Sequence, residues 1–156
     1  LSSSSAASDV YKRQDENTIA EIIAGLVLHN IDVDQLIKID QLQIVTAEDF
    51  YLRSGKFALD SIISQIEAFL ESAKKEGYQG SRVAGEVTWL ARRLDSLDEF
   101  FEYEAILNSV FNRKPVKLLC QYDSKKLFGD IIVRALQTHK RVLIGLNLFE
   151  NTYYKH

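Results

Sequence analysis

Apolar residues recur at helical spacing in four stretches, namely residues 18–26, 58–76, 96–111 and 124–136. The first and third stretches open with capping boxes, Thr18-x-x-Glu21 and Ser96-x-x-Glu99. The pattern predicts four helices at these positions. Shorter helical turns are expected at residues 47–52 and after Thr88.

Short apolar runs alternate with these helices. The runs are residues 42–46 (LQIVT), 82–87 (RVAGEV), 116–122 (VKLLCQY) and 141–149 (RVLIGLNLF). Strands separated by single helices pair in parallel through right-handed crossovers, and apolar strands indicate helices on both faces of the sheet. The sequence therefore predicts an α/β fold, a three-layer sandwich around a mostly parallel sheet.

The start of the chain reads differently. The chain has 156 residues and no methionine, and residues 1–14 begin with a serine run and have no usable periodicity. Such a stretch is typical of an artefactual or disordered tail, although a natural flexible linker is the alternative. We therefore expect one domain over residues 15–156, with residues 1–14 outside it.

Composition excludes several classes of function. The 19 basic and 22 acidic residues give a net charge of −3, which argues against direct nucleic-acid binding. No apolar run is long enough to cross a bilayer, and no basic amphipathic helix suits a membrane surface. The single cysteine, Cys120, excludes an internal disulfide and a multi-cysteine metal site, so a cytoplasmic setting is expected.

Metal and cofactor sites are not predicted. His29, His139 and His156 lack the spacing of metal ligands, and His139 is expected to complement the end of a helix. Cys120 is expected to be a small buried residue within a strand. The acidic run from Asp95 to Glu104 is interpreted as a solvated helix face.

Candidate chemistry lies where the predicted strands end. Ligands of open parallel sheets bind beyond the carboxyl ends of the strands, where Glu86 and Asp123 fall. Arg82 would share a sheet face with Glu86, and Trp89 would supply an aromatic wall. The alternatives are helix capping by the two carboxylates, for which Thr88 competes with Glu86, and core packing by Trp89.

A nucleotide-binding loop is absent from the visible sequence. Gly55-Lys56 resembles the end of a P-loop, but Phe50 stands where the upstream glycine is required. Phe57 also replaces the residue that would bind Mg²⁺. No enzyme is predicted. A RecA-like NTPase, with its phosphate loop in a missing upstream segment, remains an alternative, in which Glu86 would activate water and Asp123 would hold Mg²⁺.

Several segments, taken in order, resemble one family. They are Phe50-Tyr51-Leu52 with Gly55 and Phe57, Gly77-Tyr78, Arg82-Val83-Ala84-Gly85-Glu86 with Trp89, Tyr103-Glu104 with Asn108, Cys120-Gln121-Tyr122-Asp123, His139, and Asn151 with Tyr153-Tyr154. This set is similar to the MEDS domain, a sensory domain of methanogens and methylotrophs related to dichloromethane-responsive regulators. The chain departs from the family at Lys140, where proline is usual. From the resemblance we also expect the family's first strand, first helix and second strand to be missing.

The resemblance implies a RecA- or KaiC-like sandwich without a P-loop and a non-catalytic, signal-input role. It implies a small ligand, such as a hydrocarbon derivative, and a histidine kinase or DNA-binding output domain. We place the ligand at the carboxyl edge of the sheet, near Arg82, Glu86, Trp89, Tyr122 and Asp123. A protein-interaction module without a ligand is the remaining alternative.

Overall fold

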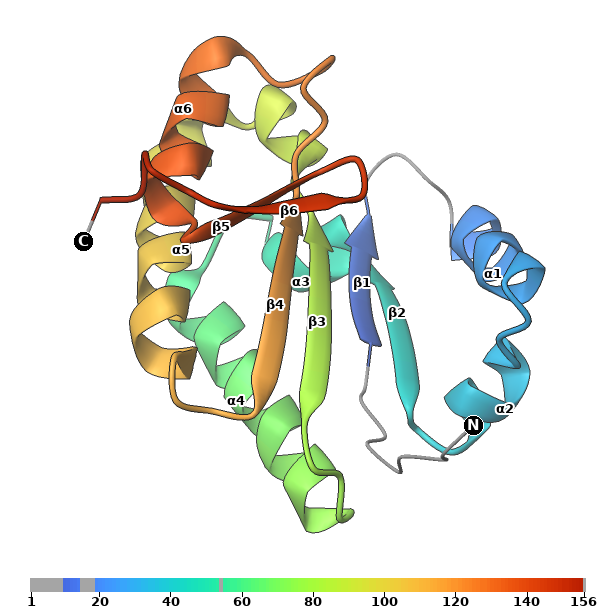
Figure 1. Ribbon diagram of the computed structural model, residues 1–156. Helices are drawn as coiled ribbons and strands as arrows, with labels where there is room; N and C mark the ends of the chain where they lie inside the picture. Colours follow the sequence, from blue (N-terminus) through green and yellow to red (C-terminus); the bar gives the residue numbers. More distant parts are fainter. Residues whose placement is uncertain (1–9, 15–18, 54, 156) are drawn as a thin grey trace.

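The structure is a computed structural model that describes residues 10–14, 19–53 and 55–155. A parallel sheet of four strands forms its centre, in the order β2-β1-β3-β4. The strands are β1 (Val10–Gln14), β2 (Leu42–Thr46), β3 (Ser81–Glu86) and β4 (Val116–Gln121). All their arrowheads point to one edge, so the carboxyl ends of the strands gather there (Figure 1).

Six α-helices connect and flank the strands in the described part of the chain. They are α1 (Ile19–Leu28), α2 (Val33–Lys38), α3 (Ala47–Tyr51), α4 (Leu59–Lys75), α5 (Leu97–Phe111) and α6 (Gly129–Thr138). Two 3₁₀ turns, η1 (Thr88–Arg92) and η2 (Leu94–Ser96), lead from β3 into α5. The predicted helices over 58–76 and 96–111, and the turns at 47–52 and Thr88, are therefore confirmed.

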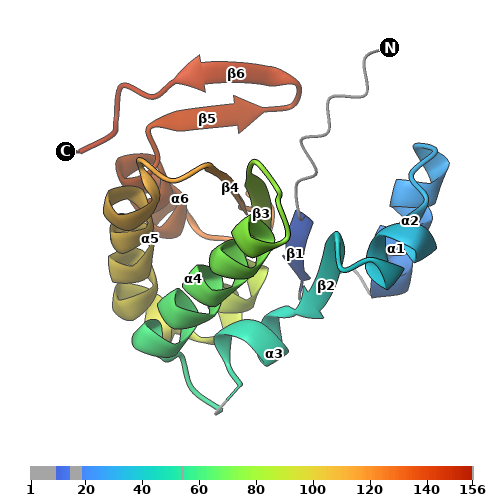
Figure 2. The same cartoon turned by 90° about the horizontal axis from the view of Figure 1, so that it is seen from below.

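The three-layer arrangement is not observed. Helices α4 and α5 lie on one side of the sheet, while α1 and α2 lie beside the edge strand β2 (Figure 2). On the opposite face of β4, Lys117 is exposed and Leu119 is 44% exposed. The fold is thus mixed α/β with a parallel sheet, and no second helical layer covers β3 and β4 within the described residues.

Residues 10–14, which were expected to belong to a tail, form strand β1. Its residues pair in parallel with β2 on one side and β3 on the other. Residues 10–14 therefore lie in the middle of the sheet rather than in a tail, because β2 reaches the rest of the sheet only through them. Residues 1–9 lie outside the described residues, and the boundary of the domain stays a prediction.

The last predicted strand is a hairpin. Strands β5 (Arg141–Ile144) and β6 (Asn147–Glu150) pair with each other in antiparallel fashion and form a separate sheet. The chain reverses at Gly145, whose φ of 59° suits a tight hairpin turn. Figure 2 shows the hairpin set apart from the parallel strands, on the side of the sheet away from α4.

Helix α6 also begins later than predicted. Ser124 is not its cap, because Asp123 instead builds a turn: its carboxylate accepts from the Lys125 amide at 2.9 Å and its carbonyl accepts from the Leu127 amide. The helix then starts at Gly129. The sequence pattern located the apolar stripe of this helix correctly but not its first turn.

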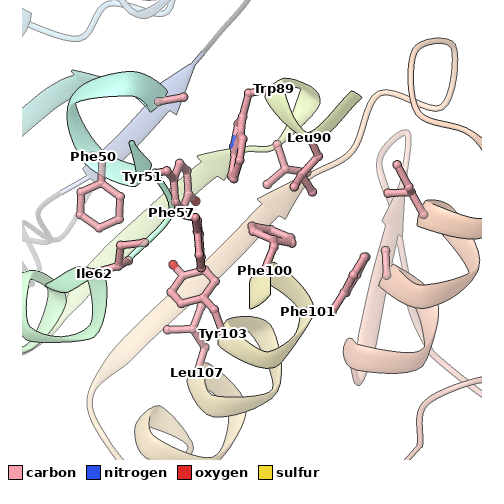
Figure 3. Packing of buried hydrophobic residues seen from close by; sticks show 14 of the residues in the cluster. Phe50, Tyr51, Phe57, Ile62, Trp89, Leu90, Phe100, Phe101, Tyr103 and Leu107 are labelled. Carbon is pink, nitrogen blue, oxygen red and sulfur yellow. The ribbon is translucent and has the colours of Figure 1, made fainter. Parts of the chain in front are cut away.

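An aromatic core joins the helices to the sheet. The rings of Tyr51 and Phe57 both stack on the Trp89 indole (Figure 3). The ring centroids are 5.1 Å apart between Tyr51 and Trp89 and 5.9 Å apart between Phe57 and Trp89. Phe100 and Tyr103 of α5 close the cluster from the other side. All five side chains are at most 5% exposed, so this core fixes α3, η1 and α5 against the ends of the strands.

Candidate functional site

A cluster of polar side chains lies at the carboxyl end of β4. We call it the polar cluster, and it consists of Glu104, Cys120, Tyr122 and His139. Cys120 is the penultimate residue of β4, Glu104 lies on α5, and His139 follows the last residue of α6. Strand β4, helix α5 and the end of α6 therefore meet at this cluster.

Local patterning explains this convergence. Side chains alternate along a strand, so Cys120 shares a face with Tyr122. On α5, Glu104 lies one helical turn from Phe100 and Leu107, and all three are buried. The Asp95–Glu104 run is therefore not a uniformly solvated face: Glu104 is only 2% exposed, whereas the Asp98 side chain is 94% exposed.

Glu104 contacts both His139 and Cys120 through its carboxylate. One carboxylate oxygen, Oε2, lies 2.8 Å from Nε2 of His139. The other, Oε1, accepts a hydrogen bond from the Cys120 thiol, with the sulfur at 3.2 Å. A buried carboxylate is unfavourable unless it is paired and hydrogen-bonded, and these two partners satisfy both of its oxygens.

The hydrogen bonds of His139 define its protonation. Nδ1 lies 2.8 Å from the Ala135 carbonyl oxygen, which only accepts, so Nδ1 carries a proton. Burial by itself would lower the pKa of His139, but the hydrogen bond to Glu104 and the charge of that carboxylate outweigh burial and raise it. The bare cluster therefore favours an imidazolium that donates from Nε2 to Glu104.

Two asparagines hold the backbone around His139. Asn108 of α5 donates to the Thr138 carbonyl at 2.6 Å. Asn151, just after the hairpin, donates to the carbonyls of Leu136 and His139, each at 2.6 Å. The imidazole is therefore anchored from α5 and from the base of the hairpin, and the end of α6 is coupled to β5 and β6.

Tyr122 adds an unpaired hydroxyl. Its ring meets the His139 ring edge to face, with centroids 5.7 Å apart. The hydroxyl is enclosed and has no hydrogen-bond partner among the described residues. Burial, with a further contribution from the charge of Glu104, raises the pKa of Tyr122 well above its usual value, so the phenol stays neutral. A buried hydroxyl without a partner is unfavourable, and a water molecule, an ion or a ligand would satisfy it.

The predicted strand-end residues divide between structural roles and this cluster. Glu86 holds the first residue of η1: its carboxylate accepts from the Thr88 amide at 2.8 Å and from the Thr88 hydroxyl. Thr88 thus donates to Glu86 and is not itself the cap. Trp89 is 2% exposed in the aromatic core, and its indole N–H has no hydrogen-bond partner among the described residues. Both residues therefore stabilise the turn after β3.

Asp123 and Arg82 lie outside the cluster. Asp123 follows Tyr122 directly, but its half-exposed carboxylate serves the turn before α6. Arg82 lies at the amino end of β3, opposite Lys117. There it lines an open groove of about 450 Å³ together with Lys114 and Pro115. The structure thus brings Tyr122 to the cluster, leaves Asp123 beside it, and separates Arg82 from both.

Glu104, Cys120 and His139 are the residues that sequence reasoning missed as a site. Each was assigned an ordinary role because 16 and 19 residues separate neighbours in the sequence. The available signal was the acidic residue on the apolar stripe of α5. A carboxylate at the same helical phase as Phe100 and Leu107 predicts burial and therefore a partner.

Comparison with known proteins agrees with the resemblance noted above. A family model described as MEDS, the methanogen/methylotroph, DcmR sensory domain, matches residues 6–140. The chain belongs to the MEDS family. The match spans β1 through α6 and includes all four residues of the polar cluster.

A curated relative of this MEDS domain is a regulator. The transcriptional repressor DcmR of Methylorubrum extorquens (strain DSM 6343 / CIP 106787 / DM4) is 31% identical over 80 residues, which are 51% of this chain and 30% of that protein. The chain therefore matches less than a third of the length of this relative. No solved structure matches the chain. Family and relative together support a regulatory sensory role.

None of the helices in the part of the chain that the structure describes is long and apolar enough to cross a membrane.

Proposed function

We propose that this MEDS domain is the signal-input part of a regulator and that it binds a small molecule at the polar cluster. The observation that carries the proposal is the enclosed Tyr122 hydroxyl, unpaired beside the Glu104–His139 pair. In a family of sensory domains, a buried charged pair next to an unsatisfied hydroxyl is best explained by a ligand that completes its hydrogen bonds.

The ligand we propose is a small, partly apolar organic molecule. Tyr122 packs on His139, and its surroundings include the aromatic rings of Tyr51 and Tyr103. A hydrocarbon derivative with one polar atom would match such surroundings. The location refines the strand-end site proposed from the sequence. It keeps Tyr122 of the predicted residues and replaces Arg82, Glu86, Trp89 and Asp123 by Glu104, Cys120 and His139.

Signal transfer would use the element that leaves the site. Only Lys140 separates His139 from β5, and Asn151 ties the end of β6 to the His139 carbonyl. A ligand that binds one arrangement of His139 better than another would shift the population of hairpin positions. A histidine kinase or DNA-binding domain that contacts the hairpin would read this shift.

A thermal-shift screen tests the proposal. The chain is heated with methanol, dichloromethane and other small alcohols and halogenated compounds, with Mg·ATP in a separate arm. A ligand at a hundred times its Kd stabilises a fold by ~2.7 kcal/mol, a readily measured shift. We expect stabilisation by an organic compound, lost in Glu104→Gln and kept in Glu102→Gln, since Glu102 is an exposed carboxylate of the same helix.

Three outcomes would contradict the proposal. Stabilisation by Mg·ATP would favour the NTPase alternative, and hydrolysis would be assayed next. Equal stabilisation of wild type and Glu104→Gln would move the ligand away from the polar cluster. No stabilisation by any compound would favour an interaction module that binds no ligand.

A further inference from the structure

We propose that Glu104, Cys120 and His139 form a binding site for a divalent metal ion of the zinc type. One oxygen, one sulfur and one nitrogen atom from these residues all lie within 4.8 Å of one another. The metal site stands independently of the ligand proposal above. Only the nature of the molecule that would occupy its remaining position rests on the proposed function.

The spacing suits tetrahedral coordination. Ligand atoms around a tetrahedral zinc ion lie roughly 3.2–3.6 Å apart, as follows from bond lengths of roughly 2.0–2.3 Å. Here the Cys120 sulfur is 3.2 Å from Oε1 of Glu104, and Nε2 of His139 is 2.8 Å from Oε2. These two distances involve different carboxylate oxygens, and the three ligand atoms all lie within 4.8 Å of one another. Rotamer adjustment that turns one oxygen of Glu104 toward both the sulfur and Nε2 would admit the ion.

The surroundings of His139 are those of a metal ligand. Ligating histidines almost always donate their second N–H to a carboxylate, a backbone carbonyl or water, which fixes the ring orientation. Here Nδ1 faces the Ala135 carbonyl at 2.8 Å, so Nε2 points to Glu104. Asn151 holds the His139 carbonyl and keeps the residue in place.

The donor types also agree with zinc. Thiolate, imidazole and carboxylate are the protein ligands that zinc takes. One thiolate, one carboxylate and one neutral imidazole balance the two positive charges of the ion, so the loaded site would carry no net charge in its buried position. Binding would release the thiol proton of Cys120 and the Nε2 proton of an imidazolium at His139.

Tyr122 would place a hydrogen-bonding group beside the open coordination position of the metal. Three protein ligands leave a fourth position open, as in zinc sites that bind exogenous molecules. The enclosed, unpaired Tyr122 hydroxyl lies against His139 and would hydrogen-bond whatever occupies that position. The occupant would be water or the oxygen or sulfur atom of a small molecule, and for a sensor the natural class is a small alcohol or thiol.

Cobalt substitution tests the metal site. The full chain is stripped with EDTA and titrated with Co²⁺, whose thiolate charge-transfer band appears in the near ultraviolet and whose visible bands report geometry. We expect one ion per chain, a thiolate band and tetrahedral visible bands, with Zn²⁺ displacing Co²⁺. Absence of the band, or octahedral visible bands, would overturn the proposal.

Variants exclude binding elsewhere. Cys120→Ser and Glu104→Gln should lose the band or tight binding, whereas Glu102→Gln and His29→Gln should keep both, because these residues lie outside the cluster. A thiolate band that persists in Cys120→Ser would contradict the site. Should a variant fail to fold by circular dichroism, alkylation of Cys120 in the wild-type chain decides: Zn²⁺ should slow it, and equal rates would contradict the site.

The ligand class is tested separately in the cobalt-loaded chain. Addition of 2-mercaptoethanol or ethanol should change the visible bands, and Tyr122→Phe should weaken that response while leaving Co²⁺ binding intact. Cobalt binding without any response would reject the proposed ligand class and keep the metal site. Stabilisation by an organic compound in the stripped chain, with no cobalt binding, would reject the metal site alone.

Discussion

At the scale of single residues, Glu104 has the largest structural role in the polar cluster. It is 2% exposed and serves both the thiol of Cys120 and the imidazole of His139. Glu104→Ala would leave both partners half-buried without their acceptor. We expect a loss of about 3–5 kcal/mol in the free energy of unfolding, as when one partner of a buried pair is removed.

Urea unfolding of the metal-free chain at pH 7 measures this loss. Glu102→Ala is the matched control, since it removes an exposed carboxylate from the same helix and should change stability by no more than about 0.5 kcal/mol. Equal effects of the two substitutions would mean that the cluster contributes nothing to the fold.

The contribution of Tyr122 to the free energy of unfolding should depend on pH. Its pKa in the folded chain is raised well above the usual value of 10.0. A raised folded-state pKa contributes stability that is complete below the unfolded pKa and is lost as pH rises through the folded pKa. Above pH 10, this tyrosine would ionise in the unfolded chain but stay protonated in the folded chain.

Tyr122→Phe should therefore be as stable as wild type, or slightly more stable, at pH 7, because it removes an unpaired hydroxyl. It should also lose less stability than wild type between pH 9 and pH 11. Urea midpoints at these pH values measure the difference, with the exposed Tyr153→Phe as control. A steeper alkaline loss in Tyr122→Phe would contradict the assignment.

At the scale of elements, β3 approaches α3 closely at Gly85. A Cβ atom placed there would lie 2.7 Å from the Tyr51 hydroxyl oxygen, and Tyr51 is fixed in the aromatic core. We expect Gly85→Ala to destabilise the fold by about 1–3 kcal/mol through overpacking. Gly129→Ala, where a Cβ meets nothing within 4 Å, should not destabilise it. Thermal unfolding of both variants separates the two cases.

The hairpin is tied to the body by Asn151. Its amide donates to two carbonyls at 2.6 Å, one in α6 and one at His139. We expect Asn151→Ala to raise amide exchange in β5 and β6 without unfolding the central sheet, because two-stranded hairpins have little stability of their own. Hydrogen exchange compared with Thr152→Ala, an exposed neighbour, measures this; unchanged exchange would mean that other contacts hold the hairpin.

At the scale of the whole molecule, the sheet depends on β1. This strand separates β2 from β3 and is paired with both. Lys12→Pro removes a backbone donor from an internal strand and should abolish cooperative unfolding, whereas Lys12→Ala keeps the donor and should fold. Circular dichroism melts distinguish the two, and a normal melt of Lys12→Pro would show that β1 is dispensable.

Local pattern predicted much of this architecture. Apolar stripes placed the cores of α4 and α5, and apolar runs placed β2, β3 and β4 near their observed bounds. The predicted capping box at Ser96 was wrong, because the Ser96 side chain makes no capping hydrogen bond. Local pattern gave the wrong element boundaries where interactions with neighbouring residues determine them. Gly145 splits an apolar run into a hairpin, and Asp123 uses its hydrogen bonds in a turn that delays α6. Helix α2 was missed because six residues carry too little periodicity.

The sequence by itself determined the elements, the parallel connections and the resemblance to MEDS domains, since capping, periodicity and motifs are local properties of the chain. Only the tertiary structure assembled Glu104, Cys120 and His139, because the crossovers that place α5, β4 and α6 side by side are non-local. The same holds for β1, whose role follows from its two neighbours rather than from its own pattern. Burial then converts an apparently solvated carboxylate into the centre of the candidate site.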